Sequence, residues 1–522
     1  MDPIVATFVI LGLAVIAFLT GRIPVAIVAV GVSVALWATG VLDLREALAG
    51  FGDPTVVFIA TLFVVSEGLD ASGVTGWVGQ AVVRLTGSDA RRALVVVMIV
   101  VALLTALISV NGAVAALLPM AVIVAVRSGI APSRLLLPLA FGAHAGSMLT
   151  LTGTPVNVLI AELALDSGAG TLGYFEFAKI GVPLVIATVL VTLLFGRRLI
   201  PDRAAASGIR DLSGHTATIR KQYPSVRDEA LVDRELGITE AVVPPRSKLI
   251  GKEVFPGMVG GEDGSIVLLA ILRNDREETR PIALQPGDVL LMQGSWDRLE
   301  ARSLGGDLLV VDHPDALRRQ LAPFGWRGWV ALGVLAAMVV VLATDLLPAA
   351  IAGLLAAGAM ILTRIVPIAR AFRRISWTTV VLVAGMIPLS TAFLATGAAD
   401  LVASGLLAVV GDSSPYLVLL ALGVVVLALG QVISNMATAL ILSPVAIAVA
   451  GELGMSPLPF LMAVTTAAAA AFLTPVATPV NLMVMGPAGY RFGDYARYGW
   501  PLALVFLAAA VFLTPVFWPF QP

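Results

Sequence analysis

Two identical Thr-Pro-Val-Asn peptides are the residues of this chain best suited to chemistry. They are Thr154–Asn157 and Thr478–Asn481, and both interrupt apolar sequence. A Thr followed by Pro at the first helical position is a favourable helix start, which presents unpaired N–H donors and the positive end of the helix dipole. An anion can bind at such a start without Arg or Lys. On the other side of the break, free carbonyls and the Thr and Asn side-chain oxygens offer a site for a hard cation such as Na⁺.

The two peptides belong to a duplication of the whole module. Leu149–Leu159 reads LTLTGTPVNVL and Leu473–Met483 reads LTPVATPVNLM, 324 positions further on (149 to 473), and the same offset maps Asn111 onto Asn435. Self-similarity at a fixed offset is a signal of the whole fold. Paired broken segments in the two halves of a membrane protein point to its substrate site. The duplication therefore predicts two half-sites that meet at the bilayer midplane and hold one anion between two cations.

A proline kink is the simpler interpretation of one such peptide, because Pro and Gly are common in membrane helices. Duplicated fold geometry alone can also preserve two kinks. The pair in register with Asn111 and Asn435 favours a binding site over that interpretation.

Composition places the chain in the membrane. Hydrophobic residues make up 58% of the sequence, charged residues 13%, and the mean hydropathy is +0.97. The formal net charge of −1 gives no argument for a nucleic-acid partner, and the absence of Cys excludes disulfides, thiolate metal sites and thiol catalysis. We find no Ser/His/Asp, metal-ligand or carboxylate-pair constellation, so neither an enzyme nor a bound cofactor is expected.

Apolar runs long enough to cross about 30 Å of hydrocarbon recur on both sides of one polar interval. In the first repeat, residues 1–200, they are about 4–20, 23–40, 54–73 and 177–196, with a re-entrant hairpin about 93–126 and a broken helix about 135–163. In the second repeat, residues 323–522, the hairpin is about 415–450 and the broken helix about 458–488. The predicted fold is a polytopic α-helical membrane protein.

The stretch 93–126 can be either two crossings or a hairpin. Arg92 precedes it and Arg127 follows it, so both ends lie on the same side by the distribution of basic residues. The duplicated Asn at its centre favours the hairpin, since a polar tip at membrane depth must face protein or a water-filled cavity.

A hairpin leaves five crossings in each repeat, and an odd number inverts the second copy. Arg370 and Arg374 follow the crossing that matches 23–40, where the first repeat has an acidic loop, so the charge pattern is inverted as well. The charges predict a multi-pass protein of the cell's inner (plasma) membrane with both termini extracytoplasmic.

The polar interval, residues 201–322, is predicted to be a separate cytoplasmic α/β domain with a core at about 230–310. Runs at 265–272 and 288–292 are separated by turn residues and are typical of short strands. The segment 203–230 is polar and is interpreted as a linker.

At these residues the chain resembles the divalent anion/sodium symporter family, which includes bacterial dicarboxylate and sulfate carriers. Each repeat of that family has a hairpin ending in Ser-Asn-Thr and a broken helix with Thr/Ser-Pro-x-Asn. Ser434-Asn435 and Asn111 match the first motif, and both Thr-Pro-Val-Asn peptides match the second. The resemblance covers both membrane halves and implies a homodimer in a lipid bilayer.

The resemblance also assigns roles to individual residues. It implies one Na⁺ site at Ser109, Asn111, Gly153 and Asn157, and a second at Asn435, Ala477 and Asn481. It implies substrate contacts at Asn111, Gly112, Thr154, Pro155, Ser434, Asn435, Met436, Thr478 and Pro479. Glu240 to Leu291 is similar to the C-terminal (TrkA-C-like) domain of potassium-conductance regulators, which makes a regulatory nucleotide of unknown identity conceivable there.

Two departures from the family pattern bear on the substrate. The Thr that ends each hairpin motif is Gly112 in one copy and Met436 in the other, and the first motif reads Ser-Val-Asn. A compact oxyanion such as sulfate needs fewer side-chain donors than a dicarboxylate. We therefore expect Na⁺-coupled symport of a small divalent anion by alternating access, with sulfate favoured and a dicarboxylate second.

Other functions remain alternatives. A Na⁺/H⁺ antiporter should depend on a buried carboxylate, for which Glu67 and Asp70 are the candidates, although an interfacial position is favoured for both. An arsenite-type exporter shares the wider fold, and a ligand-gated channel or sensor would use the soluble domain as its gate. His144 has no titratable counterpart at Ala468, so we interpret it as a satisfied interior histidine and not as a proton relay.

Overall fold

The chain forms a helical part and a strand-containing insertion. The computed structural model describes residues 2–20, 22–87, 89–203, 236–260, 266–273, 276–278, 280–295, 299, 308–310, 324–410 and 414–521. The predicted linker 203–230 lies outside these residues except for Arg203. Two compact units are distinguished, one comprising Met1–Leu69, Val78–Ile209 and Trp329–Pro522, the other comprising Asp70–Trp77 and Arg210–Gly328.

The helices α1 to α10 of the first repeat correspond in order to α14 to α23 of the second. The first has α1 Pro3–Thr20, α2 Val25–Ala38, α3 Leu44–Leu48, η1 Ala49–Gly52, α4 Pro54–Ala71, α5 Val74–Thr86, α6 Ala90–Leu107, α7 Val110–Arg127, α8 Ser133–Gly146, η2 Leu151–Gly153, α9 Pro155–Asp166 and α10 Ala178–Leu199. The second has α14 Trp326–Ala343, α15 Ala349–Leu362, α16 Ile368–Arg374, α17 Trp377–Ala395, α18 Ala398–Val410, α19 Pro415–Gly430, α20 Asn435–Glu452, α21 Pro457–Ala469, α22 Pro479–Ala488, α23 Phe492–Ala508, η4 Ala509–Leu513 and α24 Thr514–Phe517.

Helix starts repeat at the offset found in the sequence. The starts of α2 and α15, α5 and α18, α8 and α21, and α9 and α22 are each 324 positions apart, for example 133 and 457. Among the described residues, seven helices are long and apolar enough to cross a membrane. The predicted fold class is therefore confirmed: two inverted-topology helical repeats, each with a helical hairpin and a broken helix. Two short helices of each repeat, α3 and α5 with their counterparts α16 and α18, were not predicted.

The hairpin helices depart from the common offset by one residue. Ser109 caps α7 and Ser434 caps α20, which makes the offset 325, and the internal prolines Pro119 and Pro444 keep the same offset. Asn435 is therefore the first residue of α20, whereas Asn111 is the second residue of α7. The structure corrects the pairing of Asn111 with Asn435, because the helix cap and not the Asn defines the register.

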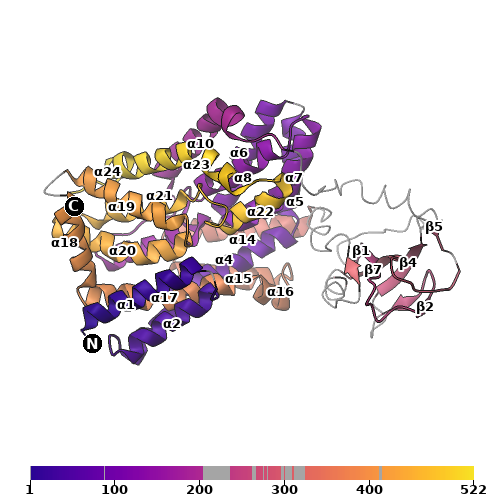
Figure 1. The fold of residues 1–522 in the computed structure, drawn as a ribbon, viewed down its shortest axis with the longest axis horizontal. Helices are drawn as coiled ribbons and strands as arrows, with labels where there is room; N and C mark the ends of the chain where they lie inside the picture. The colour runs from indigo at the N-terminus through magenta and orange to yellow at the C-terminus, as the bar shows by residue number, and fades with distance from the viewer. Residues whose placement is uncertain are drawn as a thin grey trace. The chain divides into compact units, whose positions relative to one another are not determined.

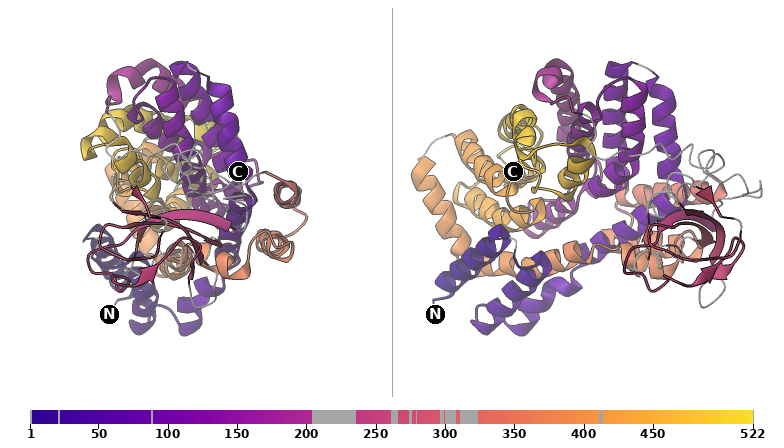
Figure 2. Two further views of the ribbon diagram at one scale, coloured as in Figure 1. Left: turned by 90° about the vertical axis from the view of Figure 1, so that its right-hand side faces the viewer. Right: turned by 45° about the vertical axis from the view of Figure 1, so that its right-hand side comes forward.

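Helices of the two repeats pack against one another reciprocally. A Cβ on Gly385 of α17 would lie 2.6 Å from Ala29 O of α2, and a Cβ on Gly353 of α15 would lie 2.2 Å from Thr61 Oγ1 of α4. Ser33 Oγ donates to Gly385 O at 2.9 Å. Figure 1 shows α1, α2 and α17 side by side, and the turned views of Figure 2 keep this arrangement. Each repeat thus contributes helices to one shared layer, as a two-fold relation between the repeats requires.

The insertion contains an antiparallel sheet. Its strands are β1 Leu236–Val242, β2 Glu253–Val254, β3 Val259–Gly260, β4 Ile266–Arg273, β5 Arg276–Glu277, β6 Ile282–Ala283, β7 Val289–Ser295 and β8 Leu309–Val310. The main sheet has the order β3-β4-β7-β1-β8, with β5 beside β4, while β2 pairs with β6. The predicted strands at 265–272 and 288–292 correspond to β4 and β7. Ile271 and Leu291 are fully buried between these strands and their neighbours.

An ion pair closes the turn before β7. Arg273 donates to both carboxylate oxygens of Asp288, at 2.8 and 2.7 Å, and the Gln285 amide donates to Asp288 Oδ2 at 2.7 Å. Gly287 has φ +92°, the left-handed conformation that a turn with Pro286 before it requires. Burial alone would raise the pKa of Asp288, but the hydrogen bonds from Arg273 and Gln285 hold the pKa of this carboxyl below its ordinary value.

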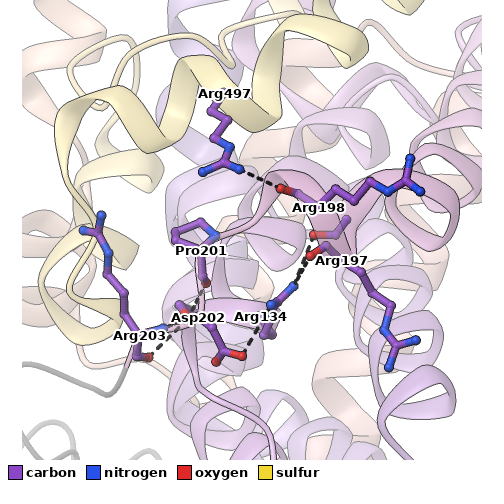
Figure 3. A network of polar contacts seen from close by, with 9 residues as sticks. Arg134, Arg197, Arg198, Pro201, Asp202, Arg203 and Arg497 are labelled. Atoms are coloured by element: carbon purple, nitrogen blue, oxygen red, sulfur yellow. Dashed lines mark hydrogen bonds and ion pairs between the residues drawn. The ribbon is translucent and has the colours of Figure 1, made fainter.

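Arg203, which follows α10, forms polar contacts with both broken helices. Arg203 donates its amide to Ser133 Oγ at the start of α8 and its Nη1 to Gly489 O at the end of α22, and it pairs with Asp494 at 2.9 Å. Figure 3 shows the adjoining contacts of Arg134, whose Nη1 donates to Arg197 O at 2.9 Å. The chain segment that leads into the insertion is thus anchored on the helices that carry the two Thr-Pro-Val-Asn peptides.

Candidate functional site

The first broken helix is held open by one asparagine. α8 ends at Gly146, and α9 begins at Pro155 after Thr154, whose Oγ1 accepts from Val156 N at 3.5 Å. Asn157 Nδ2 donates to Ser147 O at 2.9 Å and to Thr150 O at 2.8 Å. These two carbonyls have lost their helical partners at the break, so the Asn157 amide satisfies them and fixes the interrupted backbone.

The second broken helix uses the same device. Asn481 Nδ2 donates to Ala471 O at 2.8 Å and to Thr474 O at 2.9 Å, the carbonyls 324 positions beyond 147 and 150. Thr478 caps α22, and its Oγ1 accepts from Asn481 N at 3.4 Å. The two interruptions are therefore breaks with a specific hydrogen-bonded geometry and not simple proline kinks, and this geometry is present twice.

Three amide oxygens in this region are buried without a hydrogen-bond partner among the described residues. They are Oδ1 of Asn157, Oδ1 of Asn481 and Oδ1 of Asn435. A buried acceptor left unpaired costs on the order of 1–3 kcal/mol. An oxygen that can only accept is satisfied by a cation and not by an anion. These residues therefore fit the ligand chemistry of Na⁺, which favours oxygen donors.

Each hairpin tip contacts the break of its own repeat. Thr150 Oγ1 donates to Ala106 O, near the end of α6, at 2.5 Å. In the second repeat, Thr474 Oγ1 donates to Gln431 O at 2.6 Å, and Gln431 Nε2 donates to Ala470 O at 3.0 Å. The tips are capped by Ser109, which accepts from Gly112 N, and by Ser434, which accepts from Ala437 N, both at 3.2 Å. The starts of α7, α9, α20 and α22 are therefore held by side-chain caps beside the two breaks.

The two half-sites are brought together across the repeats. α9 of the first repeat packs on α20 and α21. α22 of the second repeat packs on α7 and α8 (Figure 1). His144 of α8 reaches across, with its Nε2 3.2 Å from Thr478 Oγ1. Reciprocal packing of this kind is what two halves of one site require.

The remaining predicted site residues differ in exposure. Thr154, Pro155, Ser434, Asn435 and Ser109 are half-buried, Met436 and Thr478 are buried, and Asn111 and Pro479 are exposed. Gly153 and Ala477 are both buried at equivalent positions. A Cβ on Gly153 would lie 2.3 Å from Ser147 O, so this position accepts only Gly in the observed backbone. Asn111, unlike Asn157, is not held inside the break.

Several residues that build the site were not predicted. Thr150 and Thr474 occupy equivalent positions, so the duplication in the sequence could have identified both residues. Gln431 corresponds to Ala106 in the register of the hairpins, so the duplication gave no signal for it. Its side chain also accepts from Leu473 N at 2.8 Å. His144 was interpreted as an interior residue, and its contact with Thr478 places it at the second half-site.

Glu67 is buried and paired with residues of the other repeat. Its side chain is buried and forms ion pairs with Arg374 at 3.2 Å and with Arg370 at 4.0 Å, both on α16. This carboxylate of the first repeat is thus paired with two cations of the second. Asp70 accepts a hydrogen bond from Thr75 Oγ1 at 2.6 Å.

Comparison with known proteins places the chain among transporters. It is 29% identical to an uncharacterized transporter of Escherichia coli, YfbS, over 98% of both chains, and 26% identical to a transporter of Synechocystis, sll0640, over 99% of this chain and 97% of that one. It is 28% identical to sodium/sulfate cotransporter 2 of Chlamydomonas reinhardtii over 45% of this chain and 27% of that protein.

The sequence also matches a protein family over nearly its whole length. The family is described as citrate transporter, and the match covers residues 15–455 and 437–520. This chain therefore belongs to the citrate transporter family, and it is a multi-pass membrane transporter and not an enzyme.

Proposed function

We propose that the protein is a secondary active transporter of the divalent anion/sodium symporter type, which imports a small divalent anion with Na⁺ by alternating access. The observation that carries this proposal is the repeated asparagine geometry. In each repeat the Asn157 or Asn481 amide nitrogen fixes the break and leaves its oxygen buried without a partner. Two such oxygens, one from each inverted repeat, suit two coupling cations on either side of one anion.

The cation sites follow from these oxygens and their neighbours. The first would comprise Asn157 with Ser109, Gly153 and, by resemblance, Asn111; the second would comprise Asn481 with Asn435 and Ala477. Thr154 and Thr478 cap the half-helices that follow the breaks, and the anion would lie between these caps, near the positive ends of α9 and α22.

Sulfate is the favoured anion and a dicarboxylate the second. In the register set by the Ser109 and Ser434 caps, Met436 corresponds to Asn111, so neither hairpin has the Thr found in dicarboxylate carriers at this position. Met436 at the other hairpin is apolar and buried. Fewer side-chain donors suit a compact oxyanion, and the name of one relative, a sodium/sulfate cotransporter, supports the same preference.

The proposal also includes the orientation of the protein in the membrane and the role of the insertion. The basic residues predict a plasma-membrane protein with extracytoplasmic termini and with residues 201–322 in the cytoplasm. The antiparallel sheet of the insertion is compatible with a TrkA-C-like domain that binds a regulatory nucleotide. A homodimer is proposed from the family resemblance alone.

A Na⁺/H⁺ antiporter that depends on a buried carboxylate is less well supported. Glu67 forms ion pairs with Arg370 and Arg374, so this carboxylate is engaged in a contact between the two repeats. The Asn-based half-sites need no titratable group to bind Na⁺.

The test is uptake of radiolabelled sulfate into proteoliposomes with an inward Na⁺ gradient, and with choline in place of Na⁺. Succinate is added as a competitor in a parallel series. Na⁺-dependent accumulation that resists succinate is expected. Accumulation blocked by succinate would return dicarboxylates to first place, and sulfate and succinate uptake that are both indifferent to Na⁺ would refute the symport proposal.

A further inference from the structure

His144 joins the first repeat to the half-site of the second. It lies on α8 with a side chain that is 3% exposed, and its Nε2 is 3.2 Å from Thr478 Oγ1, the cap of α22. The imidazole contacts Phe472 edge-on, with ring centroids 5.9 Å apart and an interplanar angle of 77°. The imidazole also interacts with the Asn481 side chain. Phe472 belongs to the break itself, so these three neighbours of the ring are all parts of the second half-site.

This arrangement has no equivalent in the first half-site. The residues that correspond to His144 and Phe472 are Ala468 and Met148, and neither can supply a ring or a hydrogen bond to the Thr154 hydroxyl. Since the asparagine geometry is the same in both repeats, the imidazole is the main polar difference between the two caps.

The hydrogen-bonding capacity of Thr478 shows what the imidazole does. A Thr hydroxyl has one proton and two lone pairs. One lone pair of Thr478 accepts from Asn481 N, at 3.4 Å, in the helix cap. His144 Nε2 contacts the hydroxyl from a second direction, which restricts rotation of the hydroxyl about its C–O bond. The hydrogen-bonding position that is left on the hydroxyl therefore points in a fixed direction. The Thr154 hydroxyl accepts only the cap hydrogen bond from Val156 N among the contacts of the described residues.

We propose that His144 is a positioning residue for the anion: it orients the Thr478 hydroxyl and so makes the second half-site the one that determines anion affinity. This inference rests on the proposed function, because it assumes that an anion binds beside Thr478. His144 acts on the anion through Thr478, and its imidazole also interacts with the side chain of Asn481, a residue of the second cation site.

The first test is a double-mutant cycle in the uptake assay with His144→Ala, Thr478→Val and the pair. Loss of one hydrogen bond to the anion-binding hydroxyl should raise the apparent KM for sulfate roughly three- to tenfold in each single variant. The double variant should be no worse than Thr478→Val, since His144 acts through that hydroxyl. The apparent KM for Na⁺ should rise by a smaller factor than that for sulfate, because the Asn481 side chain keeps its hydrogen bonds to Ala471 O and Thr474 O when His144 is replaced. His144→Gln should recover part of the loss. Equal losses for sulfate and Na⁺, or additive losses in the cycle, would overturn the inference.

The second test does not depend on transport. The chain has three histidines, His144, His215 and His313, so isotope-labelled imidazoles can be assigned by comparison with His144→Gln. In the purified full-length protein, Thr478→Val should shift the His144 ring resonances, whereas Thr154→Val, the matched variant of the other half-site, should not. Unshifted His144 resonances in Thr478→Val would refute the positioning role even if Na⁺-driven uptake is found. Shifted resonances in a protein without Na⁺-dependent uptake would refute the proposed function and leave the contact established.

Discussion

The two halves of the candidate site share a backbone and differ in the side chains around it. Asn157 and Asn481 form the same pair of hydrogen bonds to carbonyls at equivalent positions. Around this common geometry, the first break contains Gly153 and the second Ala477, and only the second cap has an imidazole beside it among the described residues. The duplication thus preserved the two asparagines that fix the interrupted backbone, while the side chains around the breaks diverged. Cation binding, which uses the shared oxygens, is expected to be similar in the two halves, and anion binding is expected to be unequal.

Removing either asparagine should have the largest effect. Asn157→Leu leaves Ser147 O without a donor and Thr150 O with only the Gly153 amide, and Asn481→Leu removes the donor to Ala471 O and Thr474 O. Each change should lower the free energy of unfolding by about 3 kcal/mol and reduce Na⁺-driven uptake to background. Thermal unfolding and uptake measure the two effects. If only one of the two variants is impaired, the halves are not equivalent and the comparison fails.

The glycine of the first break should be less replaceable than the alanine of the second. Gly153→Ala places a Cβ 2.3 Å from Ser147 O, a backbone atom, and should cost about 2 kcal/mol together with most of the uptake activity. Ala477→Gly, its matched control, should cost less than about 1 kcal/mol. Equal tolerance at the two positions, measured by thermal unfolding and uptake, would show that the backbone of the first break is looser than the structure indicates.

Loss of the Glu67 ion pair should lower the stability of the protein without abolishing transport. Glu67 corresponds to Thr391 in the second repeat, so it belongs to only one half. Glu67→Gln should lower the free energy of unfolding by about 2 kcal/mol, because Arg370 is left buried and Arg374 is only partly screened by solvent. Na⁺-dependent uptake at permissive temperature should persist. A stable Glu67→Gln protein without uptake would instead favour carboxylate-driven exchange.

Substitution of Asp288 in the insertion should affect neither half-site. The pKa of Asp288 is held below its unfolded value of about 3.9, so its contribution to stability is present above that pH and is lost as the pH falls through the folded-state pKa. Asp288→Asn should therefore destabilise the insertion by about 2 kcal/mol at neutral pH, and the difference from the unchanged protein should vanish in strong acid. Hydrogen exchange of the β4 and β7 amides measures this. A constant difference at every pH would contradict the ion-pair explanation.

The sequence predicted what depends on local patterns. The Thr-Pro-Val-Asn peptides predicted two helix breaks, and the 324-residue offset predicted matching helices, because capping and helix starts are set by neighbouring residues. The hairpin register was wrong by one residue, since a single Asn in each copy fits an offset of 324 while the Ser caps fit 325. The contacts of His144 with Thr478 and of Glu67 with Arg374 join distant parts of the chain and depend on how the repeats pack, which no local pattern encodes.

The most direct test of the account is the dependence of the initial sulfate uptake rate on Na⁺ concentration in proteoliposomes. Two cation half-sites that share one anion predict a sigmoidal dependence and more than one Na⁺ transported per sulfate, with both features lost in Asn157→Leu and in Asn481→Leu. A rate that is hyperbolic in Na⁺, with one Na⁺ per sulfate, would contradict paired half-sites, and a rate that is unchanged when choline replaces Na⁺ would contradict the account as a whole.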